Sequence, residues 1–75
     1  MIMDTKYLVL KDAIETYQTR ILILNDLMEN TFDILKRETD PKKIEDAGSL
    51  LSRTRLEIIH LKKELDLAQG QLQTM

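Results

Sequence analysis

Residues 38–41 read Glu38-Thr39-Asp40-Pro41, and this short stretch decides the fold. Proline disfavours helix in the residue before it but suits the first turn of a new helix. Asp40 is a good N-cap for that helix. Lys36 and Arg37 lie just before the break, where cations favour a helix C-terminus. We therefore expect one helix to end near residue 37, a turn at 38–40, and a second helix from Pro41.

On both sides of this turn, apolar residues recur at alternating intervals of three and four. This spacing is typical of helices that pair along a heptad seam, whose positions are named a and d. The pattern runs from Met3 to Leu35 and again from Ile44 to Met75, with only Thr31 and Thr54 polar. The expected seam residues include Tyr7, Leu10, Ile14, Tyr17, Ile21, Leu24, Met28, Leu51, Ile58, Leu61, Leu65 and Leu72.

The expected fold is all-α, an antiparallel two-helix hairpin that resembles a coiled coil. Its helices cover about residues 5–37 and 41–72 within a single domain of residues 1–75, because a turn of a few residues forces two helices antiparallel. Asp4 or Thr5 caps the first helix. Gly48 leaves one alternative open, in which the second helix is kinked there and Ser49 caps its main part.

The chain is too small to bury a large core. It has 75 residues and no cysteine, so disulfides cannot staple it. Domains of this size are marginal alone and usually need a disulfide, a metal or another chain. We therefore expect the hairpin to complete a helical bundle, by homodimerisation or by binding another helical protein.

Several large apolar residues remain after the seam is built. Ala13, Leu27 and Ile34 at heptad position g, with Phe32 at e, would widen the seam near the turn. Single surface aliphatics are common and need no explanation, but contiguous apolar patches usually mark interaction sites. We favour partner binding for the residues outside the seam, which are Leu8, Val9, Leu22, Ile23, Leu56, Ile59 and Leu67.

Charge and hydropathy weigh against two other classes of target. The chain carries 11 basic and 13 acidic residues, whereas nucleic-acid binding depends on neutralising phosphates. No apolar run is long enough to span a membrane, no signal peptide is recognisable, and a cytoplasmic protein is expected. One alternative remains, a Rop-like four-helix-bundle regulator that binds nucleic acid through basic residues of the second helix: Lys42, Lys43, Arg53, Arg55, Lys62 and Lys63.

No residue pattern points to an enzyme, a cofactor or a small-molecule substrate. His60 and Glu64 share one helical face, but a metal site needs three or four ligands and the chain has no second histidine. Ser49 and Ser52 lack the glycine-rich turn that exposes a nucleophile. Adjacent carboxylates such as Glu45 and Asp46 have no evident pocket to perturb them.

The second half of the sequence combines a charged turn with two groups of neighbouring aliphatic residues. A turn with Asp40-Pro41-Lys42-Lys43 leads to Leu50-Leu51 and then to Ile58-Ile59-His60-Leu61. In this half, and in overall length, the chain is similar to the YscE type of bacterial co-chaperones, small helical hairpins that hold type III secretion needle subunits in the cytoplasm. No diagnostic motif can be transferred residue by residue. The resemblance implies a cytoplasmic chaperone heterodimer, in which a larger helical chaperone docks on the hairpin.

Overall fold

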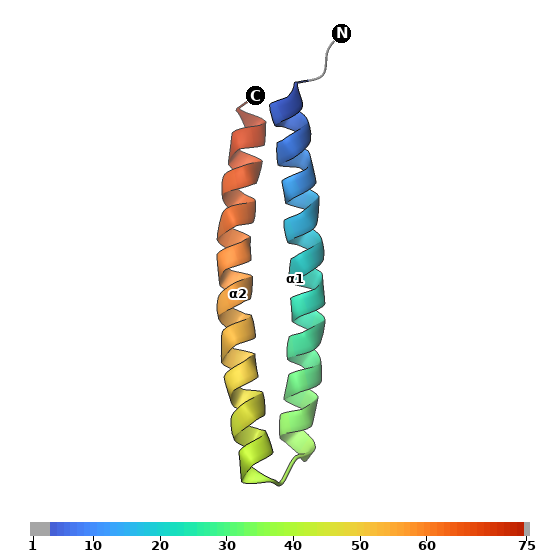
Figure 1. The fold of residues 1–75 in the computed structure, drawn as a ribbon, viewed down its shortest axis with the longest axis vertical. Coiled ribbons are helices and arrows are strands. Elements are labelled where there is room, and N and C mark those ends of the chain that lie inside the picture. Colours follow the sequence, from blue (N-terminus) through green and yellow to red (C-terminus); the bar gives the residue numbers. More distant parts are fainter. Residues whose placement is uncertain (1–3, 75) are drawn as a thin grey trace.

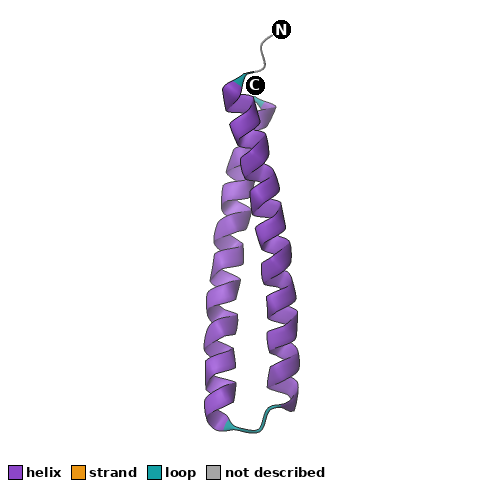
Figure 2. Ribbon diagram, turned by 45° about the vertical axis from the view of Figure 1, so that its right-hand side comes forward, coloured by secondary structure: helices purple, strands orange, loops and turns teal. Residues whose placement is uncertain are grey.

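The computed structural model describes residues 4–74, which form two long helices. Helix α1 spans Thr5–Arg37 and helix α2 spans Pro41–Gln73. They lie side by side and antiparallel, joined by a short turn at one end of a rod measuring 61 × 16 × 13 Å (Figures 1 and 2). The all-α hairpin is therefore confirmed, and its helices begin and end within one residue of the expected positions.

Carboxylates cap the helices and hold the turn. Asp4 Oδ1 accepts a hydrogen bond from the backbone N–H of Lys6 at 2.9 Å, and Asp40 Oδ1 accepts one from Lys42 at 3.0 Å. The backbone N–H of Glu38 donates to the Ile34 carbonyl at 2.8 Å and closes α1. Asp40 therefore caps α2 as expected, and Asp4 rather than Thr5 caps α1.

The Glu38 side chain adds a feature that we did not expect from the sequence. Its Oε1 accepts hydrogen bonds from the backbone N–H groups of Asp40 at 3.0 Å and Thr39 at 3.1 Å. The N–H of Asp40, followed by that of Thr39 and by the positive charge of Lys43, lowers the pKa of Glu38 below its ordinary value. An ionised Glu38 thus connects the C-cap of α1 to the N-cap of α2.

The heptad seam is the line of contact between α1 and α2. Its most buried apolar side chains are Ile14, Leu24, Ile58 and Ala68. The remaining apolar seam residues within residues 4–74 are half-buried, except Ile44 in the first turn of α2, which is 38% exposed. Two further seam positions, Met3 and Met75, lie outside the described residues.

The two polar seam residues are among the most buried side chains in the described chain. Thr31 is 3% exposed and Thr54 is 4% exposed. Each hydroxyl donates to a carbonyl one turn earlier in its own helix, Thr31 to Leu27 at 2.7 Å and Thr54 to Leu50 at 2.8 Å. Because these bonds satisfy the hydroxyls locally, neither threonine needs a polar partner on the opposite helix.

Helix α2 is continuous through Gly48. Gly48 and Gly70 both have negative φ, and a Cβ atom built on either would meet nothing within 4 Å. The kinked alternative, with Ser49 as a cap, is therefore not observed. Neither glycine is required by its backbone conformation or by a close neighbour.

Candidate interaction surface

The hairpin has two long flanks, one on each side of its seam. In an antiparallel pair of helices, the g positions of both helices border one side of the seam and the e positions border the other. The g flank comprises Lys6, Ala13, Arg20, Leu27 and Ile34 of α1 with Lys43, Leu50, Glu57, Glu64 and Gln71 of α2. The e flank comprises Lys11, Gln18, Asn25 and Phe32 of α1 with Gly48, Arg55, Lys62 and Gln69 of α2.

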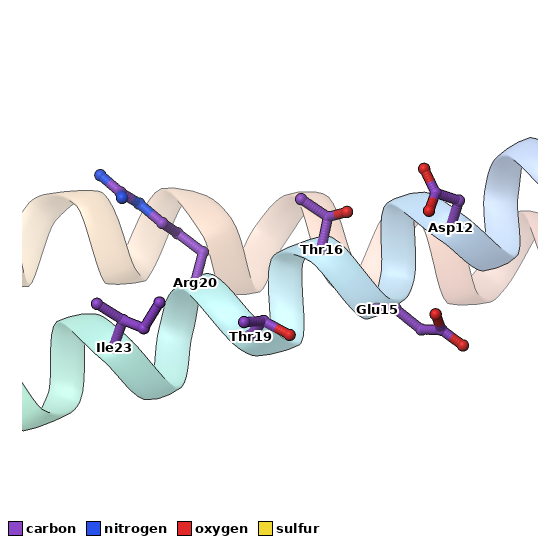
Figure 3. Close-up of a pocket in the computed structure, with 6 residues that line it drawn as sticks. All are labelled: Asp12, Glu15, Thr16, Thr19, Arg20 and Ile23. Carbon is purple, nitrogen blue, oxygen red and sulfur yellow. The ribbon is translucent and has the colours of Figure 1, made fainter.

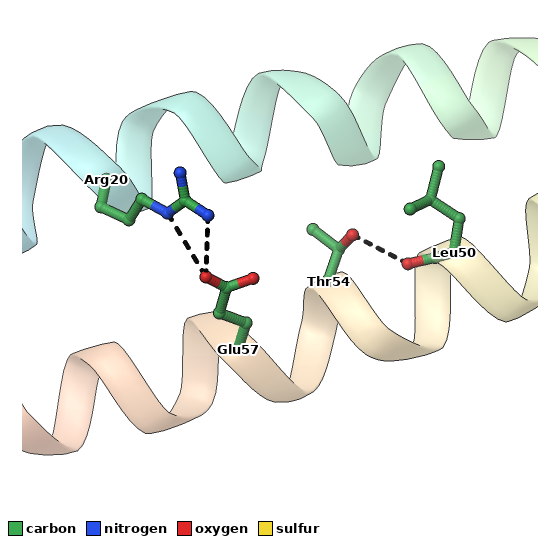
Figure 4. A network of polar contacts seen from close by, with 4 residues as sticks. All are labelled: Arg20, Leu50, Thr54 and Glu57. Atoms are coloured by element: carbon green, nitrogen blue, oxygen red, sulfur yellow. Dashed lines mark hydrogen bonds and ion pairs between the residues drawn. The ribbon is translucent and has the colours of Figure 1, made fainter.

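An ion pair on the g flank shows which residues of the two helices lie at the same level. Arg20 of α1 reaches across the seam to Glu57 of α2, with Nη2 at 3.0 Å and Nε at 3.3 Å from the same carboxylate oxygen (Figure 4). The side chains remain 53% and 43% exposed, so the pair itself adds little to stability. We did not predict it, although the g positions of both residues in an antiparallel register would have indicated it.

The seven residues expected to bind a partner are all exposed, between 47% and 67%. They do not form one patch, because their heptad positions divide them. Leu8, Leu22 and Ile59 occupy b positions, which border the e flank. Val9, Ile23 and Leu67 occupy c positions, which border the g flank, and Leu56 lies on the outer line of α2.

Residues expected to widen the seam near the turn are instead largely at the surface. Leu27 is 36% exposed, Ile34 is 48% exposed and Phe32 is 45% exposed. The expectation of a wider seam was wrong for these three, because two helices bury only their a and d positions well and leave e and g at the edge. Leu27 and Ile34 therefore belong to the exposed apolar surface of the g flank, beside Ile23.

A shallow groove of about 410 Å³ follows the e flank. Its floor is apolar, from Ile21, Leu22 and Leu65, and its rim carries Gln18 and Lys62. Both helices contribute to this groove. It can accept an apolar side chain of a partner helix, with an acidic group beside Lys62.

A second depression, of about 420 Å³, lies on the outer side of α1 (Figure 3). All six of its lining residues come from that one helix: Asp12, Glu15, Thr16, Thr19, Arg20 and Ile23. Their side chains are spread along the helix and point in different directions (Figure 3). A surface of this kind does not converge on a substrate as an enclosed site does.

Residues that could carry chemistry are dispersed over the rod. His60, Ser49 and Ser52 are exposed. Within residues 4–74, no three histidine or acidic side chains lie close enough together to hold a metal ion. Every buried side-chain nitrogen or oxygen of the described residues has a hydrogen-bond partner, so no unsatisfied polar group marks a buried site.

Neither of the two described helices has an apolar stretch of the length and hydropathy required to cross a membrane. Comparison of the chain with known protein families, with curated proteins and with solved structures finds no match.

Proposed function

We propose that this chain is a helix-binding interaction module without catalytic activity, a small co-chaperone or assembly adaptor. The observation that carries the proposal is an imbalance in apolar side chains. Among the described residues, four hydrophobic side chains are buried, whereas eleven large ones are at least a third exposed. Fully burying an aliphatic side chain contributes about 1.5–3 kcal/mol, so a partner that covered half of the exposed set would stabilise the hairpin substantially.

A partner helix is the occupant that suits these surfaces. The exposed apolar residues are distributed along a narrow rod, and both helices line the apolar floor of the e-flank groove. An amphipathic helix buries side chains at intervals of three and four, which matches the spacing of such a line. A role in type III secretion, in the cytoplasm, is the specific setting that we propose, and it is supported by the length and hairpin form of the chain.

Site-specific photocrosslinking in the native cells tests this function. A photoreactive amino acid in place of Leu22, Ile59 or Leu67 should form adducts with a helical protein, because these side chains are 55–67% exposed and apolar. Asp26 provides the matched control, since it lies on the outer, polar line of α1. Equal labelling from Asp26, or no adduct from the three apolar positions, would contradict a helix-binding role.

A nucleic-acid-binding regulator is the second candidate, supported by three basic residues on the e flank. Lys11, Arg55 and Lys62 share this flank, and within the two helices no acidic residue occupies an e position. Acidic residues at the neighbouring b positions offset this charge, and of the aromatic residues only Phe32 shares this flank, whereas proteins that bind single strands stack successive bases on several aromatic side chains. Filter binding of RNA and DNA at low salt, with Lys62→Glu as the comparison, decides the matter; no retention of the unmodified protein would exclude this candidate.

A further inference from the structure

We propose that the g flank is a dimerisation surface, on which a second copy of this chain packs with its turn at the same end to form a four-helix bundle. This inference rests on the proposed function, because it names the first partner that the helix-binding surface takes. It leaves the e flank and its groove free for a different protein.

The g flank is organised in layers, and the Arg20–Glu57 ion pair shows which residues share a layer. One heptad nearer the turn on each helix stand Leu27 and Leu50, so these two leucines face each other across the seam at the next layer. Leu27 is 36% exposed and Leu50 is half-buried, and the side chain of Leu50 extends toward α1 (Figure 4). An apolar layer therefore lies directly beside a charged layer.

If a twofold axis runs parallel to the long axis of the rod, each layer of one copy meets the same layer of the other copy. It places α1 of one copy opposite α2 of the other at the same level, which gives the isologous contact that most dimers use. The Leu27/Leu50 layer would then contain four leucines. In the charged layer, each Arg20 would face Glu57 of the other copy as well as its own, so the charges alternate around the bundle. Arg20 and Glu57 are exposed enough to take this second partner.

When the two turns lie at opposite ends, the layers of the two copies match less well. The apolar layer near one turn would then meet the distant layers of the other copy. With the two rods fully overlapped, the Leu27/Leu50 layer would meet Ala13 and Glu64, and burying leucine against unpaired charge is unfavourable. The Arg20/Glu57 layer lies near the middle of the rod and would meet its own copy, with Arg20 opposite Arg20. In the same-end arrangement, the Leu27/Leu50 layer meets only leucine and the Arg20/Glu57 layer meets opposite charge. Lys43 lies beside Ile34 in the last layer before the turn, where its exposed side chain can extend into solvent.

The e flank is a poorer surface for self-association. Its charged residues are Lys11, Arg55 and Lys62, all basic. A symmetric contact through this flank would bring like charges together, and charge complementarity is what sets the register and the choice of partner in such interfaces. The g flank, by contrast, carries both signs in its Arg20/Glu57 layer, at the middle of the rod.

The exposed area of the chain agrees with a missing partner. A compact monomer of 8.8 kDa is expected to expose roughly 4800 Å², whereas this chain exposes 6073 Å². The difference is on the order of 1000 Å², and a standard interface buries about 800 Å² on each partner. Ile23 and Ile34, which are 55% and 48% exposed, flank the leucine layer and would supply much of the apolar part.

Sedimentation equilibrium over a range of micromolar concentrations tests the dimer with the full chain. The unmodified protein should sediment at twice 8.8 kDa. Leu27→Glu should raise the dissociation constant at least about 100-fold, because it places charge in the apolar layer. Leu22→Glu is the matched control on the other flank and should leave the constant within about 3-fold. Circular dichroism verifies that each variant remains helical.

A charge swap tests the layer without altering the apolar surface. Arg20→Glu alone and Glu57→Arg alone should each weaken the dimer, because one sign would then fill the whole layer. The double variant should restore it. Dimerisation that is unchanged in both single variants would overturn the assignment of this flank, as would a dimer sensitive to Leu22→Glu but not to Leu27→Glu.

The relative orientation of the two copies can be measured separately, as a distance between spin labels. Because the chain contains no cysteine, Thr39→Cys allows one spin label to be placed at each turn. The same-end arrangement predicts a label separation of about 20 Å, given helices spaced 8–10 Å apart, whereas opposite ends would separate the labels by nearly the 61 Å length of the rod. The longer separation, or a monomer at all concentrations, would overturn the proposal. If the protein is a monomer but a photoreactive group at Ile59 still forms adducts with a helical protein, only the dimerisation proposal is refuted. If the protein is a monomer and forms no adducts, the helix-binding function is refuted as well.

Discussion

Replacing Gly48 by alanine adds one methyl group to a continuous turn of α2. The new Cβ would meet nothing within 4 Å, and the backbone φ is already negative, so the substitution introduces neither a clash nor strain. Glycine in a helix interior costs about 0.8–1.0 kcal/mol relative to alanine, chiefly through the entropy of the unfolded chain. Gly48→Ala should therefore raise the free energy of unfolding by roughly that amount.

Thermal unfolding followed by circular dichroism at a fixed protein concentration measures this effect. For a domain of this size, 1 kcal/mol shifts the Tm by about 4–8 °C. Gly70→Ala is the matched control; it should give a smaller increase, because Gly70 lies in the last turn of α2, where the helix frays. Ser49→Ala separates the two forms of the helix: it should be neutral or stabilising in a continuous helix and should cost about 1 kcal/mol if Ser49 were an N-cap. A fall in Tm for Gly48→Ala together with a loss for Ser49→Ala would refute the continuous helix.

Three further changes address the seam, the caps and the turn. Leu24→Ala should cost about 2–5 kcal/mol in chemical denaturation, because Leu24 is 4% exposed, whereas Leu22→Ala, at 67% exposed, should change stability by less than about 0.5 kcal/mol; equal effects would contradict the seam. Asp40→Ala should lower stability by about 0.5–2 kcal/mol through the lost N-cap, visible as a lower Tm, and an unchanged Tm would show that the cap is not formed in solution. The folded state lowers the pKa of Glu38 below its ordinary value of 4.5, so the contribution of Glu38 to stability should be complete above that value and disappear as the pH falls through the folded pKa. Glu38→Gln should remove this part of the acid dependence of stability. Identical acid titrations of the two proteins would exclude the contact between Glu38 and the turn.

The helices and their seam could be predicted because the sequence carries a strong and unbroken period. Every expected seam position of α1 within the described residues is buried or half-buried, and one proline with its preceding aspartate fixes the turn. Ile44 departs from the pattern because it lies in the first turn of α2, where little of α1 extends beyond it to cover it. Local rules of spacing and capping thus determine almost all of this fold.

The candidate site was harder to predict, since it depends on how residues from two helices come together. The exposure of Leu22, Ile23 and Ile59 followed from their heptad positions, but their separation onto different flanks requires the antiparallel register. Leu27 and Ile34 were assigned to a wider seam because hydrophobicity alone does not distinguish a seam edge from a surface. The Glu38 contacts escaped notice since a side chain that binds the backbone of its own turn leaves no periodic signal.

The turn at one pole of the rod has a mechanical consequence. The start of α1 and the end of α2 lie next to each other at the opposite pole (Figure 1). A force that pulls the two ends apart would separate the seam contacts one layer at a time, beginning with Tyr7 and Leu72. The seam contacts should therefore separate in sequence, whereas pulling between one end and the turn would load the hydrogen bonds of one helix along its own axis.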